Sequence, residues 1–323
     1  MGPVLDISGL STHFFTRKGV LKAVDDVSFS VRESEIVGLV GESGSGKSIT
    51  GFSILGLVDA PGRVVGGRVL FRGEDLLTLA PAQMRAVRGK RIAMIFQDPM
   101  MTLNPVLSIG TQMVEAVLAH DAVEKSAARA RARDALGLVG IPSPEERLDA
   151  YPHQFSGGMR QRVAIAIALL HRPDLIIADE PTTALDVTIQ SQILYEIKKL
   201  TTEFRMALIW ISHDLGVVAG LADRVLVMYA GRIVEAGPID AVLDRPAHPY
   251  THGLINAVPA SVPRGEPLRA IRGAAPSPLT RPAGCAFRDR CDYATDLCRT
   301  EPTQETADTR AWRCFHPLVG APA

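Results

Sequence analysis

A glycine-rich stretch near the N-terminus constrains the fold of this chain more than any other feature. The sequence GLVGESGSGKSITGFSILGL has the spacing G-x-x-x-x-G-K-S, with an apolar run before it and a helical pattern after it. In this setting backbone N–H groups and the start of the helix bind a phosphate chain, Lys47 reaches the β- and γ-phosphates, and the Ser48 hydroxyl ligates Mg²⁺. The predicted phosphate-binding residues are Gly41, Glu42, Ser43, Gly44, Ser45, Gly46, Lys47 and Ser48.

Strand and helix patterns around this loop predict an α/β fold. The runs EIVGLV, DLIIAD, ALIWIS and RVLVMY are continuous and apolar, as is typical of buried strands in a mainly parallel sheet. VDDVSFSV at 24–31 alternates with period two and predicts a half-exposed strand. Longer helical patterns separate these runs through most of the first 245 residues, so we expect helices to cover the sheet.

Two further regions depart from this alternation. Between Pro105 and Ala150 the strand patterns stop and helical patterns take over, which predicts an α-helical subdomain inserted over about 98–160. After Leu243 proline and glycine become frequent and periodicity fades. We therefore expect a nucleotide-binding domain over 1–245 and a loop-rich extension over 246–323.

Charge and hydropathy exclude several classes of protein. The chain has 35 basic and 35 acidic residues, so no global field draws it onto nucleic acid or an anionic membrane. Its longest apolar run, Val163 to Leu170, is far shorter than the roughly 20 residues of a membrane-spanning helix. The N-terminus lacks the basic start and apolar stretch of a secretion signal. We expect a cytoplasmic protein that does not span a membrane.

Polar residues follow two of the predicted strands. LIIADEP places Asp179 and Glu180 at the carboxyl end of a buried strand, and His213 follows another in WISHDL. Ligands of open α/β sheets bind at that edge. Asp179 suits the shell of a metal ion, Glu180 suits the polarisation of a water that attacks the γ-phosphate, and His213 suits a contact with the terminal phosphate.

A serine–glycine motif identifies the family that this chain resembles. QFSGGMRQRVAIAIALL places Ser156, Gly157 and Gly158 at the start of a helix, just ahead of the strand that ends at Asp179. With Gln97 in IFQDP, TALD at 183–186 and His213, the order of motifs resembles the ATP-binding-cassette (ABC) ATPases over residues 4 to about 243. Phe155 and Met159 stand where that family more often has leucine and glutamine, and the serine–glycine core is intact.

The resemblance implies a role for each motif. In that family two cassettes face each other, and each ATP lies between the phosphate loop of one and the serine–glycine motif of the other. Lys47 and Ser48 would hold phosphate and Mg²⁺, with Asp179 and Gln97 supporting the metal. Glu180 would be the catalytic base, with His213 and Gln97 as further catalytic residues, Gln97 also contacting the transporter. Ser156, Gly157 and Gly158 would complete the partner's site. Phe14 or Phe15 lies where the family stacks an aromatic ring on adenine, and a buried strand residue is the alternative.

The C-terminal region narrows the resemblance to one branch. RPAHPYTHGLINAVP at 245–259, a proline-rich stretch and four cysteines resemble the C-terminal extension of oligopeptide and dipeptide importer ATPases, a group that includes nickel importers. The implied function is the ATP-hydrolysing subunit of a bacterial dipeptide or oligopeptide importer. The alternatives are a nickel or other small-solute importer and a nucleic-acid-directed cassette ATPase. The latter would be expected to show a second cassette, a long coiled coil or a strongly basic face.

Partners and location follow from the same resemblance. The chain would work with a second ABC ATPase subunit, commonly a paralogue, and with two membrane permease subunits. An extracytoplasmic peptide-binding protein would deliver the substrate, and no nucleic acid would take part. The expected location is the cytoplasmic face of the cell inner membrane, as a peripheral subunit.

All the cysteines of the chain lie near its C-terminus, at Cys285, Cys291, Cys298 and Cys314. Disulfides are not expected in the reducing compartment of an ATP-consuming chain. Zinc suits four thiolates, but the cysteines lack the close pairs usual in zinc sites, and they match no standard ferredoxin spacing. The family resemblance implies one iron–sulfur cluster, [4Fe–4S], with zinc as the alternative. Four arginines beside the cysteines are compatible with a negatively charged cluster or with simple solvent exposure; they are Arg288, Arg290, Arg299 and Arg313.

Overall fold

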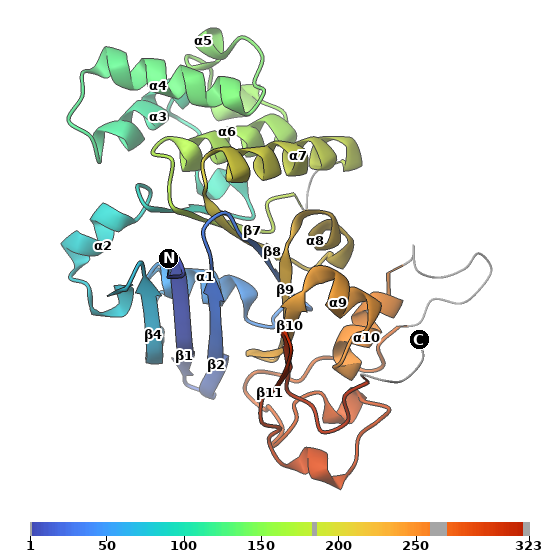
Figure 1. Cartoon of the computed structure of the whole chain (residues 1–323). Coiled ribbons are helices and arrows are strands. Elements are labelled where there is room, and N and C mark those ends of the chain that lie inside the picture. The colour runs from blue at the N-terminus through green and yellow to red at the C-terminus, as the bar shows by residue number, and fades with distance from the viewer. Residues whose placement is uncertain (1, 183–185, 259–269, 319–323) are drawn as a thin grey trace. The chain divides into compact units, whose positions relative to one another are not determined.

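The computed structural model describes residues 2–182, 186–258 and 270–318 (Figure 1). Its contacts divide the chain into two compact units. Unit 1 comprises Met1–Val4, Val31–Glu35 and Thr78–Ile209, and unit 2 comprises Leu5–Ser30, Ile36–Leu77 and Trp210–Ala323. Within the described ranges, no helix combines the length and the apolar character needed to cross a bilayer.

Unit 1 is mainly helical around a short parallel strand pair. β6 (Ile92–Ile95) pairs in parallel with β7 (Leu175–Asp179), with Ile92 opposite Leu175. The helices of this unit are α2 (Pro81–Val87), α3 (Ile109–Leu118), α4 (Lys125–Leu138), α5 (Pro144–Arg147), α6 (Gly157–Leu169) and α7 (Val187–Glu203). β8 (Ala207–Ser212), buried at all its positions, begins in unit 1 and ends in unit 2.

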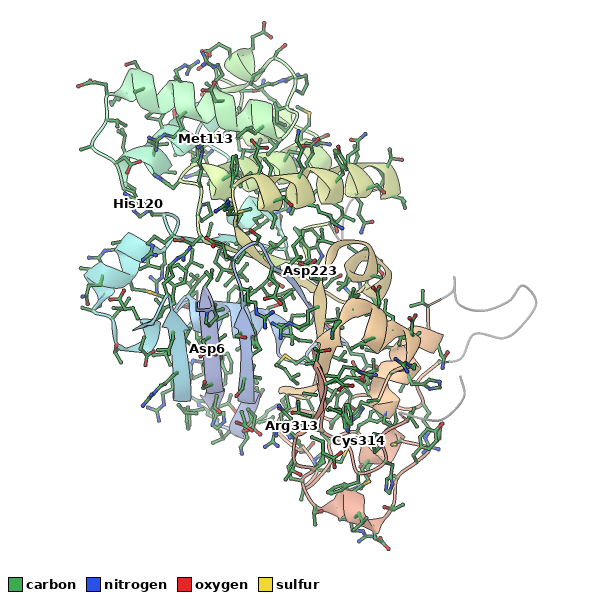
Figure 2. All side chains as sticks on the ribbon, viewed as in Figure 1. Asp6, Met113, His120, Asp223, Arg313 and Cys314 are labelled. Atoms are coloured by element: carbon green, nitrogen blue, oxygen red, sulfur yellow. The ribbon has the colours of Figure 1, made fainter. Side chains whose placement is uncertain are left out.

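Apolar side chains hold the helices of unit 1 together. α4 packs against α3 and α6 because small and apolar residues repeat on one face, including Ala128, Ala132 and Leu136. Met113 of α3, labelled in Figure 2, is fully buried. α6 in turn contacts β6. This packing fixes the start of α6 relative to the ends of β6 and β7.

Unit 2 contains two sheets. β2 (Gly19–Val31), β1 (Leu5–Thr16), β4 (Gly62–Phe71) and β5 (Glu74–Asp75) form one in that order, and Figure 1 shows β2, β1 and β4 side by side. In the second, β3 (Ile36–Val40) lies parallel to β9 (Arg224–Tyr229), and β10 (Arg232–Pro238) pairs antiparallel with β9. β12 (Arg310–Trp312) continues the sheet beside β10 and pairs with β11 (Glu305–Ala307). The remaining helices are α1 (Lys47–Ile54), α8 (Leu215–Leu221), α9 (Ile239–Asp244) and α10 (Pro249–Asn256).

The structure confirms the strands expected from the sequence. The four continuous apolar runs form β3, β7, β8 and β9, and the alternating run forms the second half of β2. Hydrophobic periodicity is a local property, so it predicts these elements without knowledge of their partners. The helix α10 and the short strand pair β11 and β12 lie in the segment expected to be rich in loops.

Candidate functional site

The phosphate loop joins β3 to α1 within unit 2. Gly41 has φ 152° and Gly46 has φ 106°, a region of backbone space that favours glycine. A Cβ atom on Gly41 would lie 2.1 Å from the carbonyl oxygen of Met228, and one on Gly46 would lie 2.2 Å from that of Ala23. Both glycines are therefore required by backbone conformation and by space.

Lys47 places a cation within this loop. It is only 5% exposed, and its Nζ donates hydrogen bonds to the carbonyl oxygens of Gly41 at 2.8 Å and Glu42 at 3.0 Å. Ser48 follows on the first turn of α1 and is half-buried. Backbone N–H groups, the positive end of α1 and an ammonium group thus gather in one loop, which suits the binding of a phosphate chain.

Glu42 ties the loop to the C-terminal part of unit 2. Its backbone N–H donates to the Tyr250 hydroxyl at 2.8 Å, and its carboxylate accepts two hydrogen bonds from Arg290. The sequence offered solvent exposure as one interpretation of Arg290, and this is wrong because Arg290 is buried. Sequence reasoning missed both contacts, since the hydrogen bonds that join Glu42 to Tyr250 and to Arg290 span 208 and 248 residues along the chain.

Two of the predicted catalytic residues meet in unit 1. Parallel pairing brings the carboxyl ends of β6 and β7 to one edge, with Asp179 as the last residue of β7 and only 4% exposed. Glu180 follows at φ 45°, a left-handed conformation that turns the chain at the strand end. The Gln97 side-chain amide donates to the Glu180 carboxylate at 3.1 Å. A carboxylate held by an amide donor is suited to orient a water and accept its proton.

The serine–glycine motif begins α6 in unit 1. Ser156 is the N-cap, and its Oγ accepts a hydrogen bond from the Met159 backbone N–H at 3.3 Å. Phe155 is buried and anchors the motif, whereas Ser156 and Gly157 are exposed. The motif therefore presents an exposed helix start carrying two glycines.

Other predicted residues lie at several places. His213, in unit 2, is exposed and directly follows β8. Phe14 is half-buried opposite Gly62, whereas Phe15 is 41% exposed with the Arg63 guanidinium carbon 4.4 Å from its ring centroid. Phe15 thus has the more exposed ring of the two, with the Arg63 guanidinium over one face. In the TALD motif, residues 183–185 lie outside the described part of the chain, and Asp186 caps α7.

The four cysteines all belong to unit 2, and Figure 2 labels Cys314. Burial raises the pKa of Cys285 to about 11 and that of Cys314 to about 12, and the charge of neighbouring thiolates adds to both shifts. Burial likewise raises the pKa of Cys291. Cys314 Sγ accepts a hydrogen bond from the backbone N–H two residues further on, at 3.3 Å. Among the side chains that the structure describes, no group of three or more His, Cys, Asp or Glu is arranged to hold a metal ion.

The chain has a glycine-rich loop between a buried strand and a helix, and a buried lysine begins that helix. These features define a P-loop nucleotide-binding protein. A family model described as ABC transporter matches residues 24–183, and one described as oligopeptide/dipeptide transporter, C-terminal region, matches residues 234–298. The chain belongs to the ABC transporter ATPases, in the oligopeptide/dipeptide transporter branch.

Individual relatives agree with this assignment. The dipeptide transport ATP-binding protein DppD of Escherichia coli (strain K12) is 48% identical over 320 residues, which cover 98% of each chain. The oligopeptide transport ATP-binding protein OppD of Haemophilus influenzae is 47% identical over 306 residues, covering 95% of this chain and 94% of that one. The dimeric, post-hydrolysis structure of the ATP-binding cassette MJ0796 bound to ADP and Pi is 26% identical, with a TM-score of 0.66, and the match covers 73% of this chain and 98% of that chain.

Proposed function

We propose that this chain is the ATP-hydrolysing subunit of a bacterial importer for dipeptides or oligopeptides. The main observation that supports ATPase activity is the phosphate loop with its buried Lys47. The peptide substrate is supported by the relatives, which are named as dipeptide and oligopeptide transport ATP-binding proteins and are similar over nearly the whole chain.

The proposed mechanism assigns each step to a residue. The loop from Gly41 to Ser48 binds the phosphates of ATP, and the Phe15 or Phe14 ring stacks on adenine. Glu180 accepts a proton from water as the water oxygen bonds to the γ-phosphorus, the bond to the β–γ bridging oxygen breaks, and ADP leaves with the bridging electrons. Gln97 holds the Glu180 carboxylate, and His213 contacts the γ-phosphate.

Mg²⁺ would neutralise charge that develops on the phosphates. The ligands proposed for it are Ser48, Asp179 and Gln97, all of which offer the oxygen donors that Mg²⁺ prefers. The burial of Asp179 fits this role, because a buried carboxylate is stabilised by a cation.

Two substitutions separate chemistry from binding. We expect Glu180→Gln to keep the affinity for ATP and to lower turnover at least about 100-fold, because an amide cannot accept the proton. Lys47→Ala should weaken ATP binding itself. The measurements are the ATP Kd and steady-state turnover in the assembled complex, with Glu203→Gln, an exposed carboxylate near the end of α7, as the matched control. Wild-type turnover by Glu180→Gln would show that another group is the base.

The four cysteines are proposed to ligate one [4Fe–4S] cluster. Burial raises the pKa of the Cys285, Cys291 and Cys314 thiols, which keeps these three protonated unless a cationic group is bound. The choice of iron and sulfur over zinc rests on the resemblance of this extension to that of the oligopeptide and dipeptide importer ATPases.

Anaerobic purification followed by metal and sulfide analysis tests the cluster. We expect about four irons and four sulfides per chain, lost in Cys291→Ser and retained in Arg299→Met, which changes an exposed neighbour of Cys298. One tightly bound zinc without sulfide would contradict the proposal. Four thiols that alkylate freely in the folded protein under those conditions would contradict it as well.

The remaining proposals concern organisation and partners. Residues 98–160 would form the inserted helical subdomain, and 246–323 the C-terminal extension with the cysteine cluster. The chain would pair with a paralogous ABC ATPase and bind two permease subunits as a peripheral protein on the cytoplasmic face of the inner membrane. An extracytoplasmic peptide-binding protein would supply the substrate. Proteins that co-purify with the chain from native membranes, identified by mass spectrometry, test this set of partners.

A further inference from the structure

An ion pair between the buried Arg290 and the half-buried Glu42 joins the phosphate loop to the segment that bears the cysteines. Arg290 Nη1 donates to Glu42 Oε2 at 2.7 Å, and Nη2 donates to Oε1 at 2.9 Å. Arg290 is only 7% exposed, and its hydrogen bonds to Glu42 raise its pKa above the usual value. Two parallel hydrogen bonds between a guanidinium and a carboxylate are the strong form of this contact. The pair is therefore fixed in geometry, unlike an exposed salt bridge.

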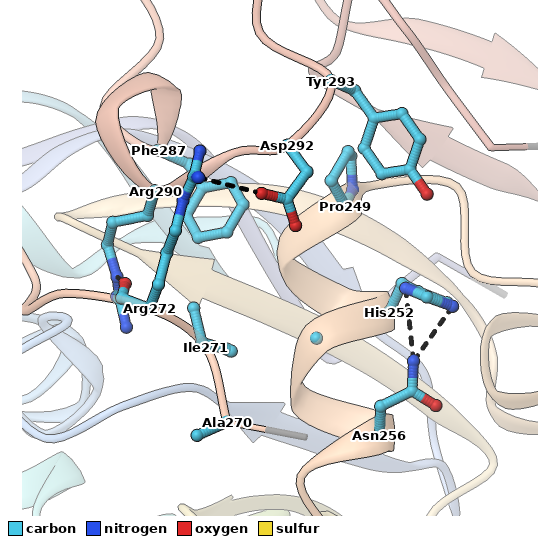
Figure 3. Close-up of a pocket in the computed structure, with 11 residues that line it drawn as sticks. Pro249, His252, Asn256, Ala270, Ile271, Arg272, Phe287, Arg290, Asp292 and Tyr293 are labelled. Atoms are coloured by element: carbon cyan, nitrogen blue, oxygen red, sulfur yellow. Dashed lines mark hydrogen bonds and ion pairs between the residues drawn. The ribbon is translucent and has the colours of Figure 1, made fainter.

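Two further hydrogen bonds and two aromatic rings also hold the Arg290 side chain. Nε donates to the Arg272 carbonyl oxygen at 2.9 Å, and Nη1 also donates to the Tyr229 hydroxyl at 3.3 Å. The guanidinium carbon lies 5.8 Å from the ring centroids of both Tyr229 and Phe287. Figure 3 shows Arg290, Arg272 and Phe287 together in the wall of a pocket. The side chain is thus held in one orientation, pointing its two terminal nitrogens at Glu42.

Glu42 occupies a sensitive position in the loop. Its carbonyl oxygen accepts one of the hydrogen bonds of Lys47 Nζ, and its N–H is held by Tyr250. The carboxylate stands in a loop whose chemistry is to bind an anion. Like charges repel, and they repel more strongly where water is partly excluded. An unpaired Glu42 would therefore oppose the binding of a triphosphate, and Arg290 cancels that charge.

We propose that Arg290 is a positioning residue of the nucleotide site, which raises ATP affinity by neutralising Glu42 and holding the loop. Arg290 ends the short 3₁₀ turn Arg288–Arg290, which lies between Cys285 and Cys291. The affinity for nucleotide consequently depends on the folding of the cysteine-bearing segment. This inference rests on the proposed ATPase function and adds a residue outside all the nucleotide motifs.

A double-substitution cycle in the full-length chain tests the inference. The Kd of Mg-ATP is measured by equilibrium titration for the wild type, Arg290→Met, Glu42→Gln and the double variant. We expect Arg290→Met to weaken binding about tenfold or more, which corresponds to the loss of a charged hydrogen-bond pair. The double variant should return to within about threefold of the wild type, because no unpaired carboxylate remains. Arg290→Lys keeps the charge and loses the paired geometry. Its Kd for Mg-ATP should lie between those of the wild type and Arg290→Met.

Controls distinguish this inference from the proposed function. Arg299→Met removes an exposed arginine of the same segment and should bind ATP as the wild type does. Thermal unfolding of each variant checks that it is folded. If Arg290→Met does not fold, the ATP affinity of Arg290→Lys is used in its place. Wild-type affinity in a folded Arg290→Met, or a double variant as weak as Arg290→Met alone, would overturn the inference. Failure of the wild type to bind Mg-ATP would instead overturn the proposed function on which it rests.

Discussion

His248 shows how strongly the environment of one residue can change its chemistry. It caps α10, with Nδ1 accepting the Tyr250 backbone N–H at 3.0 Å, and its own backbone N–H donates to Glu235 at 2.8 Å. Burial lowers the pKa of His248 to about 3, from an ordinary value of 6.5. The folded protein therefore keeps this ring neutral over a pH range in which the unfolded chain binds a proton.

This difference predicts a pH dependence of stability. The contribution of His248 to the free energy of unfolding is constant above about pH 6.5. This contribution is lost as the pH falls from 6.5 towards 3, because only the unfolded state takes up the proton. The free energy of unfolding should fall by about 1.4 kcal/mol per pH unit in that window through this group. His248→Asn keeps an acceptor for the cap and removes the titration. Urea unfolding measures the free energy of unfolding of the wild type and of His248→Asn between pH 4 and 8. The two values should converge as the pH falls. Parallel plots of these values against pH would exclude the predicted titration of His248.

At the scale of elements, a buried ion pair between Glu235 of β10 and Arg310 of β12 joins the strand pair β11 and β12 to β10. Glu235 of β10 is 0% exposed and accepts hydrogen bonds from Arg310 of β12 and from the backbone N–H groups of Ala247 and His248, each at 2.8 Å. Arg310 also donates to the Arg245 carbonyl oxygen at 2.6 Å. One carboxylate thus links three successive parts of the C-terminal region.

Removal of the cation should be costly, because the carboxylate would remain buried. We expect Arg310→Met to lower the free energy of unfolding by about 3–5 kcal/mol. Arg299→Met, at an exposed arginine, should change it by less than about 0.5 kcal/mol. Chemical denaturation of the three proteins measures both values. Equal stability of the two variants would mean that the burial of the Glu235 carboxylate does not depend on Arg310.

At the scale of the whole molecule, the question is whether one chain contains a complete ATP site. The family resemblance implies that the exposed helix start at Ser156 completes the site of another cassette. The related MJ0796 cassette, bound to ADP and Pi, is dimeric in its structure. A single chain should accordingly be a poor ATPase.

Turnover per chain should rise with protein concentration, and rise further when the cassette and membrane partners are added. Ser156→Arg should remove this stimulation at the partner's site while leaving the ATP Kd of the isolated chain within about twofold, since the motif acts in trans. Turnover is measured against concentration, with the mass of the particle determined in parallel. A high rate per chain, independent of concentration, for a demonstrated monomer would refute this view.

The sequence by itself determined the elements and motifs whose signals are local. The phosphate loop needs only a glycine spacing between a strand and a helix, and β3, β7, β8 and β9 follow from runs of apolar residues. The contact of Gln97 with Glu180 was not predicted, because β6 ahead of Gln97 was not among the predicted strands. Parallel pairing of β6 with β7 brings the two residues to one edge.

Tertiary structure alone decided the contacts that join distant segments. Arg290 is an unremarkable arginine beside a cysteine in the sequence, and only folding brings it to Glu42, 248 residues away. The same holds for Arg310 and Glu235, and for the ring of Phe15 that stays exposed while Phe14 packs near Gly62. A charge is buried when a specific partner compensates its desolvation, and the identity of that partner is set by the fold and not by neighbouring residues.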